Sequence, residues 1–161
     1  MLGYTALYSH ARGGSAVSAE AFIETEVASA IVKRVEASWS LFGDKGAAIT
    51  QVESLADECS LAGWDGDHAD PISPEAVQTA CDFVRALPEG FPLPEFAPEP
   101  DGSISLDWIR SKQQLISLSI GSGERVPYAW LDGTDKGHAV GHFDGSAVQQ
   151  RLLSAILSIV G

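Results

Sequence analysis

The densest group of side chains that could do chemistry lies between Trp64 and Asp70, where the sequence reads Trp-Asp-Gly-Asp-His-Ala-Asp. Its three carboxylates and one imidazole are groups that could hold a hard divalent cation. A calcium loop of the EF-hand type needs oxygen ligands at its first, third and fifth positions and glycine at its sixth. Counted from Asp65, the fifth position is Ala69 and the sixth is Asp70, so the segment does not match that loop.

The same segment also has a purely structural explanation, which we favour. Gly63 ends a helix, Trp64 packs into the core, and Asp70 or Ser73 caps the next helix. Two functional interpretations stay open beside it. One is a metal site, and the other is a partner-recognition loop that includes Trp64. Both use the same four polar residues: Asp65, Asp67, His68 and Asp70.

No other part of the chain presents a recognisable catalytic set. His138 and His142 are four residues apart, but on the strand predicted there they would lie about 13 Å from one another and could not share a metal. The sequence has no nucleophile elbow, phosphate-binding loop or dinucleotide fingerprint. Cys59 and Cys81 fall on apolar helix faces and are expected to be buried free thiols. We therefore expect no catalytic residue and no cofactor.

The negative charge of the chain is concentrated in one third of it. The segment from Glu53 to Asp107 contains thirteen acidic residues and one base, Arg85, and so carries the entire formal net charge of −12. A one-signed segment repels nucleic acid and anionic membranes and attracts basic partners or cations. Binding to nucleic acid by simple electrostatics is therefore excluded, and a basic protein partner is favoured.

The elements that position these residues begin with a helix. Residues 1–18 are expected to form a flexible arm or a short strand, followed by one domain over 19–161. Apolar residues recur every four positions, which predicts a helix over about 19–42. The sequence Gly-Asp-Lys-Gly at 43–46 is expected to end this helix.

Two further helices are predicted in the acidic third. The first covers about 47–61, and the second covers about 74–87. Ser73 is a good N-cap for the second, and Pro74 suits the first helical position because its missing N–H has no partner there in any case.

After these helices, apolar and polar residues alternate, which is typical of half-buried antiparallel strands. A β-meander is predicted over about 103–143, with a short extra strand near Phe96. Pro127 cannot donate to a strand ladder, which favours an edge position or a bulge. A helix over about 146–159 is expected to pack on one face of the sheet. Helices followed by a meander and a closing helix predict the α+β class.

The aromatic residues of one predicted strand give a second candidate surface. Tyr128 and Trp130 share one strand face, while Ala129 and Leu131 share the other. Trp130 is favoured as a core residue. If both faces are apolar, the sheet is either covered twice or uses one face as an interface. Tyr128 and Trp130 are therefore also candidates for contact with a partner.

A longer pattern extends through the acidic third. It includes Gly-Trp-Asp-Gly at 63–66, Pro-Ile-Ser-Pro-Glu-Ala at 71–76, Leu-Pro at 87–88, and Pro-Asp-Gly at 100–102, which leads into Ser-Ile-Ser-Leu-Asp-Trp. In these features the chain resembles a family of small bacterial proteins to which no function is attached. The family would have an aromatic residue and then glycine where this chain has Asp67 and His68. The resemblance implies no catalytic residues.

These observations favour a non-enzymatic, acidic protein-binding module of the immunity-protein, antitoxin or inhibitor type, which binds a basic protein. A DNA-mimic protein would be a special case of it. The alternative is a divalent-metal-dependent enzyme or metal-binding domain that uses the Asp65–Asp70 loop. The sequence leaves a homodimer open. The absence of a long apolar run, the N-terminal sequence and the two predicted free thiols lead us to expect a cytoplasmic protein with no membrane partner.

Overall fold

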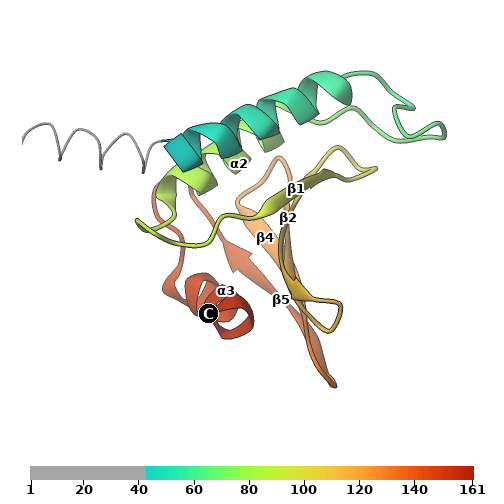
Figure 1. Ribbon diagram of the computed structural model, residues 1–161. Helices are drawn as coiled ribbons and strands as arrows, with labels where there is room; N and C mark the ends of the chain where they lie inside the picture. Colours follow the sequence, from blue (N-terminus) through green and yellow to red (C-terminus); the bar gives the residue numbers. More distant parts are fainter. Residues whose placement is uncertain (1–42) are drawn as a thin grey trace, which may run out of the picture. The chain divides into compact units, whose positions relative to one another are not determined.

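A five-stranded antiparallel sheet forms the centre of the computed structural model, which describes residues 43–161 (Figure 1). The strands are paired in sequence order, so each one lies beside the next one in the chain. This arrangement is the predicted meander, with the expected extra strand at its start. The strands are β1 (Glu95–Pro98), β2 (Ile104–Ser111), β3 (Gln114–Ile120), β4 (Arg125–Asp132) and β5 (Asp135–His142).

The described helices comprise a helix over residues 43–58, α2 (Pro74–Ala86) and α3 (Gln150–Val160). The first of them runs alongside α2, and α3 follows the sheet (Figure 1). The predicted N-cap of α2 is confirmed, because the hydroxyl of Ser73 accepts a hydrogen bond from the backbone N–H of Ala76 at 3.0 Å. None of the described helices is both long and apolar enough to cross a membrane. Together with the antiparallel meander, these helices confirm the predicted α+β class.

The core lies on one face of the sheet, which we call the inner face. The register places the buried residues of β2 opposite those of β3, as in the pairs Ile104–Ile120 and Leu106–Leu118. The same cluster includes buried side chains from α2 and α3, and the rings of Phe83 and Phe143 pack edge to face within it. The outer face of β2 and β3 carries serine and aspartate instead, so the predicted alternation holds.

The expected helix stop at residues 43–46 is wrong, because these residues are helical. Two glycines cost a helix about 1 kcal/mol each, which is why the sequence indicates a break there. Tertiary contacts favour the helix instead. The Nζ atom of Lys45 donates hydrogen bonds to the backbone carbonyls of Arg85 at 3.0 Å and Leu87 at 2.5 Å, at the C-terminal end of α2. A cation there also interacts favourably with the dipole of α2.

The C-terminal helix starts later than predicted, at Gln150 rather than near residue 146. A local turn occupies the expected first helical turn. The carboxylate of Asp144 accepts hydrogen bonds from the backbone N–H of Ser146 at 3.0 Å and from its hydroxyl at 2.6 Å. Such side-chain bonds compete with the helix for the backbone.

Pro127 lies in β4, an interior strand, although an edge or a bulge was predicted. The pairing of β3 with β4 ends at Leu118 and Tyr128, one residue before the proline is reached. Because Glu124 bonds to Phe143 across β4 and β5, the alternation of the ladder places the nitrogen of Pro127 on the β3 side, beyond the last β3–β4 pair. The missing N–H of Pro127 therefore costs the sheet no hydrogen bond in the β3–β4 pairs that form, although the strand is not at an edge.

The predicted arm at 1–18 and the predicted helix at 19–42 lie outside the described residues. The proposed domain boundary at residue 19 therefore stays a prediction.

Candidate functional site

The Trp64–Asp70 segment forms a loop that is closed by its own hydrogen bonds. The indole N–H of Trp64 donates to the carbonyl of Asp70 at 2.9 Å, and the backbone N–H of Gly63 donates to the carbonyl of Ala69 at 2.8 Å. The Trp64 ring is partly buried and packs against the core, as predicted. The packing of Trp64 and the cap by Ser73 agree with the structural explanation, whereas the helix before the loop ends at residue 58 and not at Gly63. The loop displays its acidic residues from a backbone held by its own hydrogen bonds.

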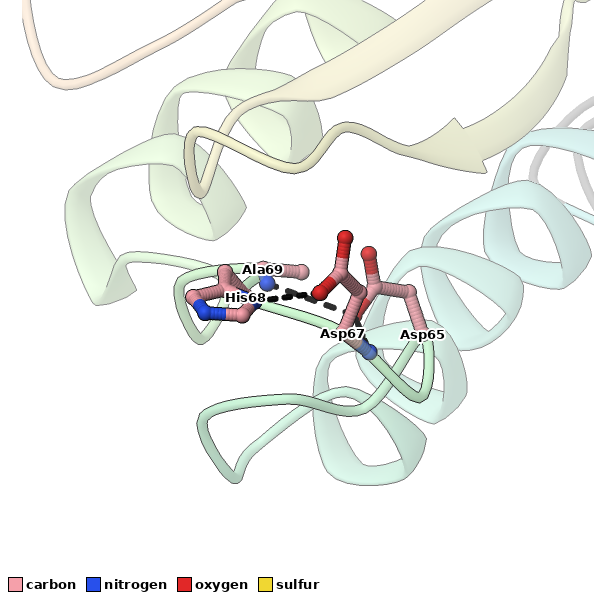
Figure 2. Close-up of polar contacts among 4 residues, drawn as sticks. All are labelled: Asp65, Asp67, His68 and Ala69. Atoms are coloured by element: carbon pink, nitrogen blue, oxygen red, sulfur yellow. Dashed lines mark hydrogen bonds and ion pairs between the residues drawn. The ribbon is translucent and has the colours of Figure 1, made fainter.

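Figure 2 shows how the polar side chains of this loop are used. One carboxylate oxygen of Asp65 accepts hydrogen bonds from the backbone N–H groups of Asp67 at 2.9 Å and Ala69 at 3.2 Å, so this side chain stabilises the turn. The imidazole Nδ1 of His68 contacts the carboxylate of Asp67 in an exposed ion pair. Exposed pairs of this kind contribute little to stability.

These residues do not assemble into a metal centre. Within residues 43–161, no three histidine, cysteine, aspartate or glutamate side chains come together as metal ligands. The carboxylates of Asp65 and Asp67 are each engaged locally, as described above. The metal-binding alternative stays a prediction, and the geometry of the loop gives it no support.

A second set of contacts attaches this loop to the turn between β1 and β2. The backbone N–H of Asp70 donates to the carbonyl of Pro100 at 2.8 Å, and that of Ser73 donates to the carbonyl of Gly102 at 2.9 Å. Gly102 has a φ of +83°, and a Cβ atom there would lie 2.7 Å from the carbonyl oxygen of Pro71. Only glycine fits this close approach without a shift of the loop.

The acidic third remains at the surface when the chain folds. We call its thirteen acidic residues the acidic face. Ten of them are exposed and three are partly buried. Within the described residues, the ion pairs of the acidic face are those of Asp82 with Arg85 at 2.8 Å and of Asp67 with His68. The face consists of Glu53, Asp57, Glu58, Asp65, Asp67, Asp70, Glu75, Asp82, Glu89, Glu95, Glu99, Asp101 and Asp107.

An exposed apolar side chain accompanies these charges. Leu61 is 76% exposed and lies between Glu58 and Asp65 in the sequence, where the first described helix gives way to the loop. This exposure was not predicted, since Leu61 was expected to be the last residue of a helix. The signal that could have found it is its position, which is outside the apolar stripe of that helix.

A network of serines and carboxylates on the outer face of the sheet was also not predicted. The carboxylate of Glu99 accepts hydrogen bonds from the hydroxyls of Ser103, at 2.5 Å, and Ser119. The carboxylate of Asp107 accepts from the hydroxyls of Ser105 at 2.6 Å and Ser117 at 2.5 Å. Although the alternating serines of the two strands are visible in the sequence, their partners depend on the register.

This network separates the acidic residues into two groups. The hydroxyl of Ser103 has one proton, which it shares between Glu99 and Asp101, and the backbone N–H of Ser103 donates to Asp101 at 3.0 Å. These contacts lower the pKa of the Asp101 carboxyl. Glu99, Asp101 and Asp107 thus have internal partners. Within the described residues, no side-chain partner is seen for the acids of the first helix or for the exposed Asp70, Glu75, Glu89 and Glu95, so these carboxylates are left for a partner.

Tyr128 and Trp130, the aromatic candidates, lie in a different place. Their ring centroids are 5.9 Å apart, and they line a cavity of about 240 Å³ with Arg151, Ala155 and Ser158 of α3. Tyr128 is buried and Trp130 is partly buried. The loop is attached to the β1–β2 turn, whereas this cavity lies between β4 and α3. The structure does not bring the two candidate sets together.

Another cavity, of about 530 Å³, lies between the first described helix and the loop over residues 88–94. Its titratable lining residues are Asp44 and Lys45, and Lys45 is bonded to backbone carbonyls as described above. With Lys45 engaged in this way, Asp44 is the one titratable side chain among the described lining residues that is not bound to another element. Cys59 and Cys81 are buried free thiols, as predicted, and burial raises the pKa of each.

A comparison of the chain with protein-family models, with curated proteins and with solved structures found no match. The function of the candidate site is therefore inferred from its own residues.

Proposed function

We propose that this protein is a non-enzymatic module that binds a basic protein through its acidic face, in the manner of an immunity protein, an antitoxin or an inhibitor. The observation that carries the proposal is the exposure of nearly all of the acidic face, with few ion pairs of its own within the described residues. A cytoplasmic location, where thiols stay reduced, agrees with the two free cysteines.

Two physical effects support this function. A one-signed surface steers an oppositely charged protein and raises its association rate by about 10- to 1,000-fold at low salt. Charge alone, however, gives little affinity at an exposed rim. Leu61 supplies an apolar side chain beside the charges, and burial of such a side chain contributes about 1.5–3 kcal/mol.

The experiment compares two variants that change the net charge equally. The first, D57N/E58Q/D65N/D67N, neutralises four acids around Leu61. The change Asp65→Asn keeps a side-chain oxygen that accepts the turn hydrogen bonds. The matched control, E124Q/D132N/D135N/D144N, neutralises four acids outside the acidic face. Proteins captured from host lysate at low salt are identified, and the affinity of the most abundant basic protein is then measured by calorimetry at increasing salt.

We expect the first variant to bind about 4- to 800-fold more weakly, because each of the four lost charge pairs contributes about 0.2–1 kcal/mol. The control variant should keep the affinity of the original protein, and Leu61→Ala should weaken binding without changing its salt dependence. Equal loss in both charge variants, or failure to capture any basic protein, would contradict the proposal.

A further inference from the structure

Within residues 43–161, the edge strand β5 has backbone groups that no other strand satisfies. The backbone N–H of Phe143 donates to the carbonyl of Glu124 at 2.8 Å, which identifies this pair as hydrogen-bonded across β4 and β5. In an antiparallel ladder, hydrogen-bonded pairs alternate with pairs that are not bonded. The odd-numbered residues of β5 therefore face β4, and the backbone groups of Lys136, His138, Val140 and His142 point away from the sheet.

The described residues cover only one end of this edge. The backbone N–H of His142 donates to the side-chain carbonyl of Gln149 at 3.2 Å, which leaves residues 136–140 open within the described part of the chain. The eight pairs of β5 with β4 are continuous, with no bulge. The opposite edge, β1, has four residues and ends in Pro98. Short strands and proline protect an edge from pairing, so in the sheet formed by residues 43–161 β5 is the edge that is left available.

We propose that β5 pairs with β5 of a second copy of this chain, antiparallel and about a two-fold axis at His138. The sheets of the two copies then form one continuous sheet. In this register, Lys136 of one copy lies opposite Val140 of the other, and Gly137 lies opposite Ala139. The outward backbone groups at 136, 138 and 140 all find partners. Isologous two-fold dimers are the commonest assemblies of soluble proteins.

The side chains on the inner face of the sheet favour another β5 as the strand that pairs with this edge. The indole of Trp130 lies over Gly137, where a Cβ atom would be only 2.4 Å from the ring. A strand added beside Gly137 therefore meets the edge of this ring and needs a small side chain there. In the proposed register, that residue is Ala139 of the second copy, and directly opposed residues have their Cβ atoms about 5 Å apart. Strand β5 therefore presents, at residue 139, the small side chain that Gly137 of a neighbouring β5 requires.

The distribution of charge favours the same pairing. Residues 108–161 contain five bases and four acids, whereas the acidic face belongs to the helices, the loop and the first two strands. Strands lie about 4.8 Å apart, so β5 is about 14 Å from β2, which exceeds the Debye length of about 8 Å at physiological salt. Pairing through β5 places the two acidic faces at opposite ends of the dimer and leaves both open.

The test measures the mass of the full chain by sedimentation equilibrium from micromolar to millimolar concentration. We expect a species of twice the 17.0-kDa chain mass. His138→Pro removes an outward N–H that makes no bond to β4, and Ala139→Glu places a charge against the second strand; both should yield monomers. The matched control, Ala129→Glu, makes the same change at an exposed position of β4 and should remain dimeric.

Hydrogen exchange of the unmodified protein gives a readout that does not depend on whether a variant folds. The amides of Lys136, His138 and Val140 should exchange more slowly as protein concentration rises, while that of Ser122, in a turn, should not change. A monomer at every concentration, a dimer that survives both edge substitutions in folded protein, or exchange at these three amides that is independent of concentration would each overturn the proposal.

Discussion

At the scale of single residues, the buried hydroxyl of Ser103 makes the stability of the fold depend on pH through the carboxyl of Asp101. Ser103 is only 5% exposed, and its hydroxyl is the main cause of the lowered pKa of Asp101. A carboxyl whose pKa is lower in the folded state stabilises the fold above its unfolded pKa, about 3.9. That stabilisation is lost as the pH falls through the lower, folded pKa.

We therefore expect Ser103→Ala to flatten the loss of stability below about pH 4, and to cost about 0.5–1.5 kcal/mol at neutral pH because the partly buried Glu99 and the exposed Asp101 lose a donor. Urea unfolding over a series of pH values measures both effects. The exposed Ser122→Ala is the control and should match the unmodified protein. An unchanged acid limb in Ser103→Ala would show that Asp101 does not depend on this hydroxyl.

Some single-residue roles could be predicted from the sequence because they depend on near neighbours. The cap by Ser73 and the packing of Trp64 against the core follow from local spacing, and both are confirmed. The contact of Ser119 with Glu99 could not be predicted, because the two residues are twenty positions apart and meet only through the register of three strands.

At the scale of elements, the attachment of the acidic loop to the β1–β2 turn depends on one glycine. Gly102→Ala should be destabilising for two reasons, which are the positive φ and the contact with the carbonyl of Pro71. Gly66→Ala is a matched control, because Gly66 has a φ of +85° and a Cβ atom added there would have no atom within 4 Å.

The control should cost about 1–2 kcal/mol, the usual penalty for a left-handed residue, and Gly102→Ala should cost more. The two free energies of unfolding, measured in urea, give the difference directly. Equal costs would mean that the loop can move away from the turn without penalty, in which case its acidic residues are not held in place.

Element types were easier to predict than element ends. Two-residue alternation over residues 103–143 indicates strands without reference to any other part of the chain, and the meander is confirmed. The helix through Gly43 and Gly46 was not predictable, because it depends on a hydrogen bond from Lys45 to carbonyls about forty residues away. The late start of α3 depends on the competing turn at Asp144, a local signal that could have been recognised.

At the scale of the whole molecule, the sheet separates two surfaces. The acidic residues belong to the first described helix, the loop, α2, the segment after α2, β1, the β1–β2 turn and β2, while β5 is the edge at the other end of the strand order. The proposed partner and the proposed second copy therefore use different parts of the protein and do not compete. The seven predicted site residues are divided between these two parts of the protein. This division depends on the order of the strands in the sheet and cannot be predicted from the local sequence.

The concentration of negative charge in residues 53–107 also has a consequence for stability. Since like charges repel in the folded state, where they are held close together, the acidic face opposes folding. Salt weakens this repulsion, because the Debye length falls from about 30 Å at 0.01 M to about 10 Å at 0.1 M.

Added sodium chloride should therefore raise the urea midpoint of unfolding over this range, with no partner present. The variant D57N/E58Q/D65N/D67N should begin at a higher midpoint and respond less to salt, while E124Q/D132N/D135N/D144N should respond as the unmodified protein does. A midpoint that is independent of salt, or a response equal in both variants, would mean that the acidic residues are too far apart to repel, and they would then also be too dispersed to act as one binding surface.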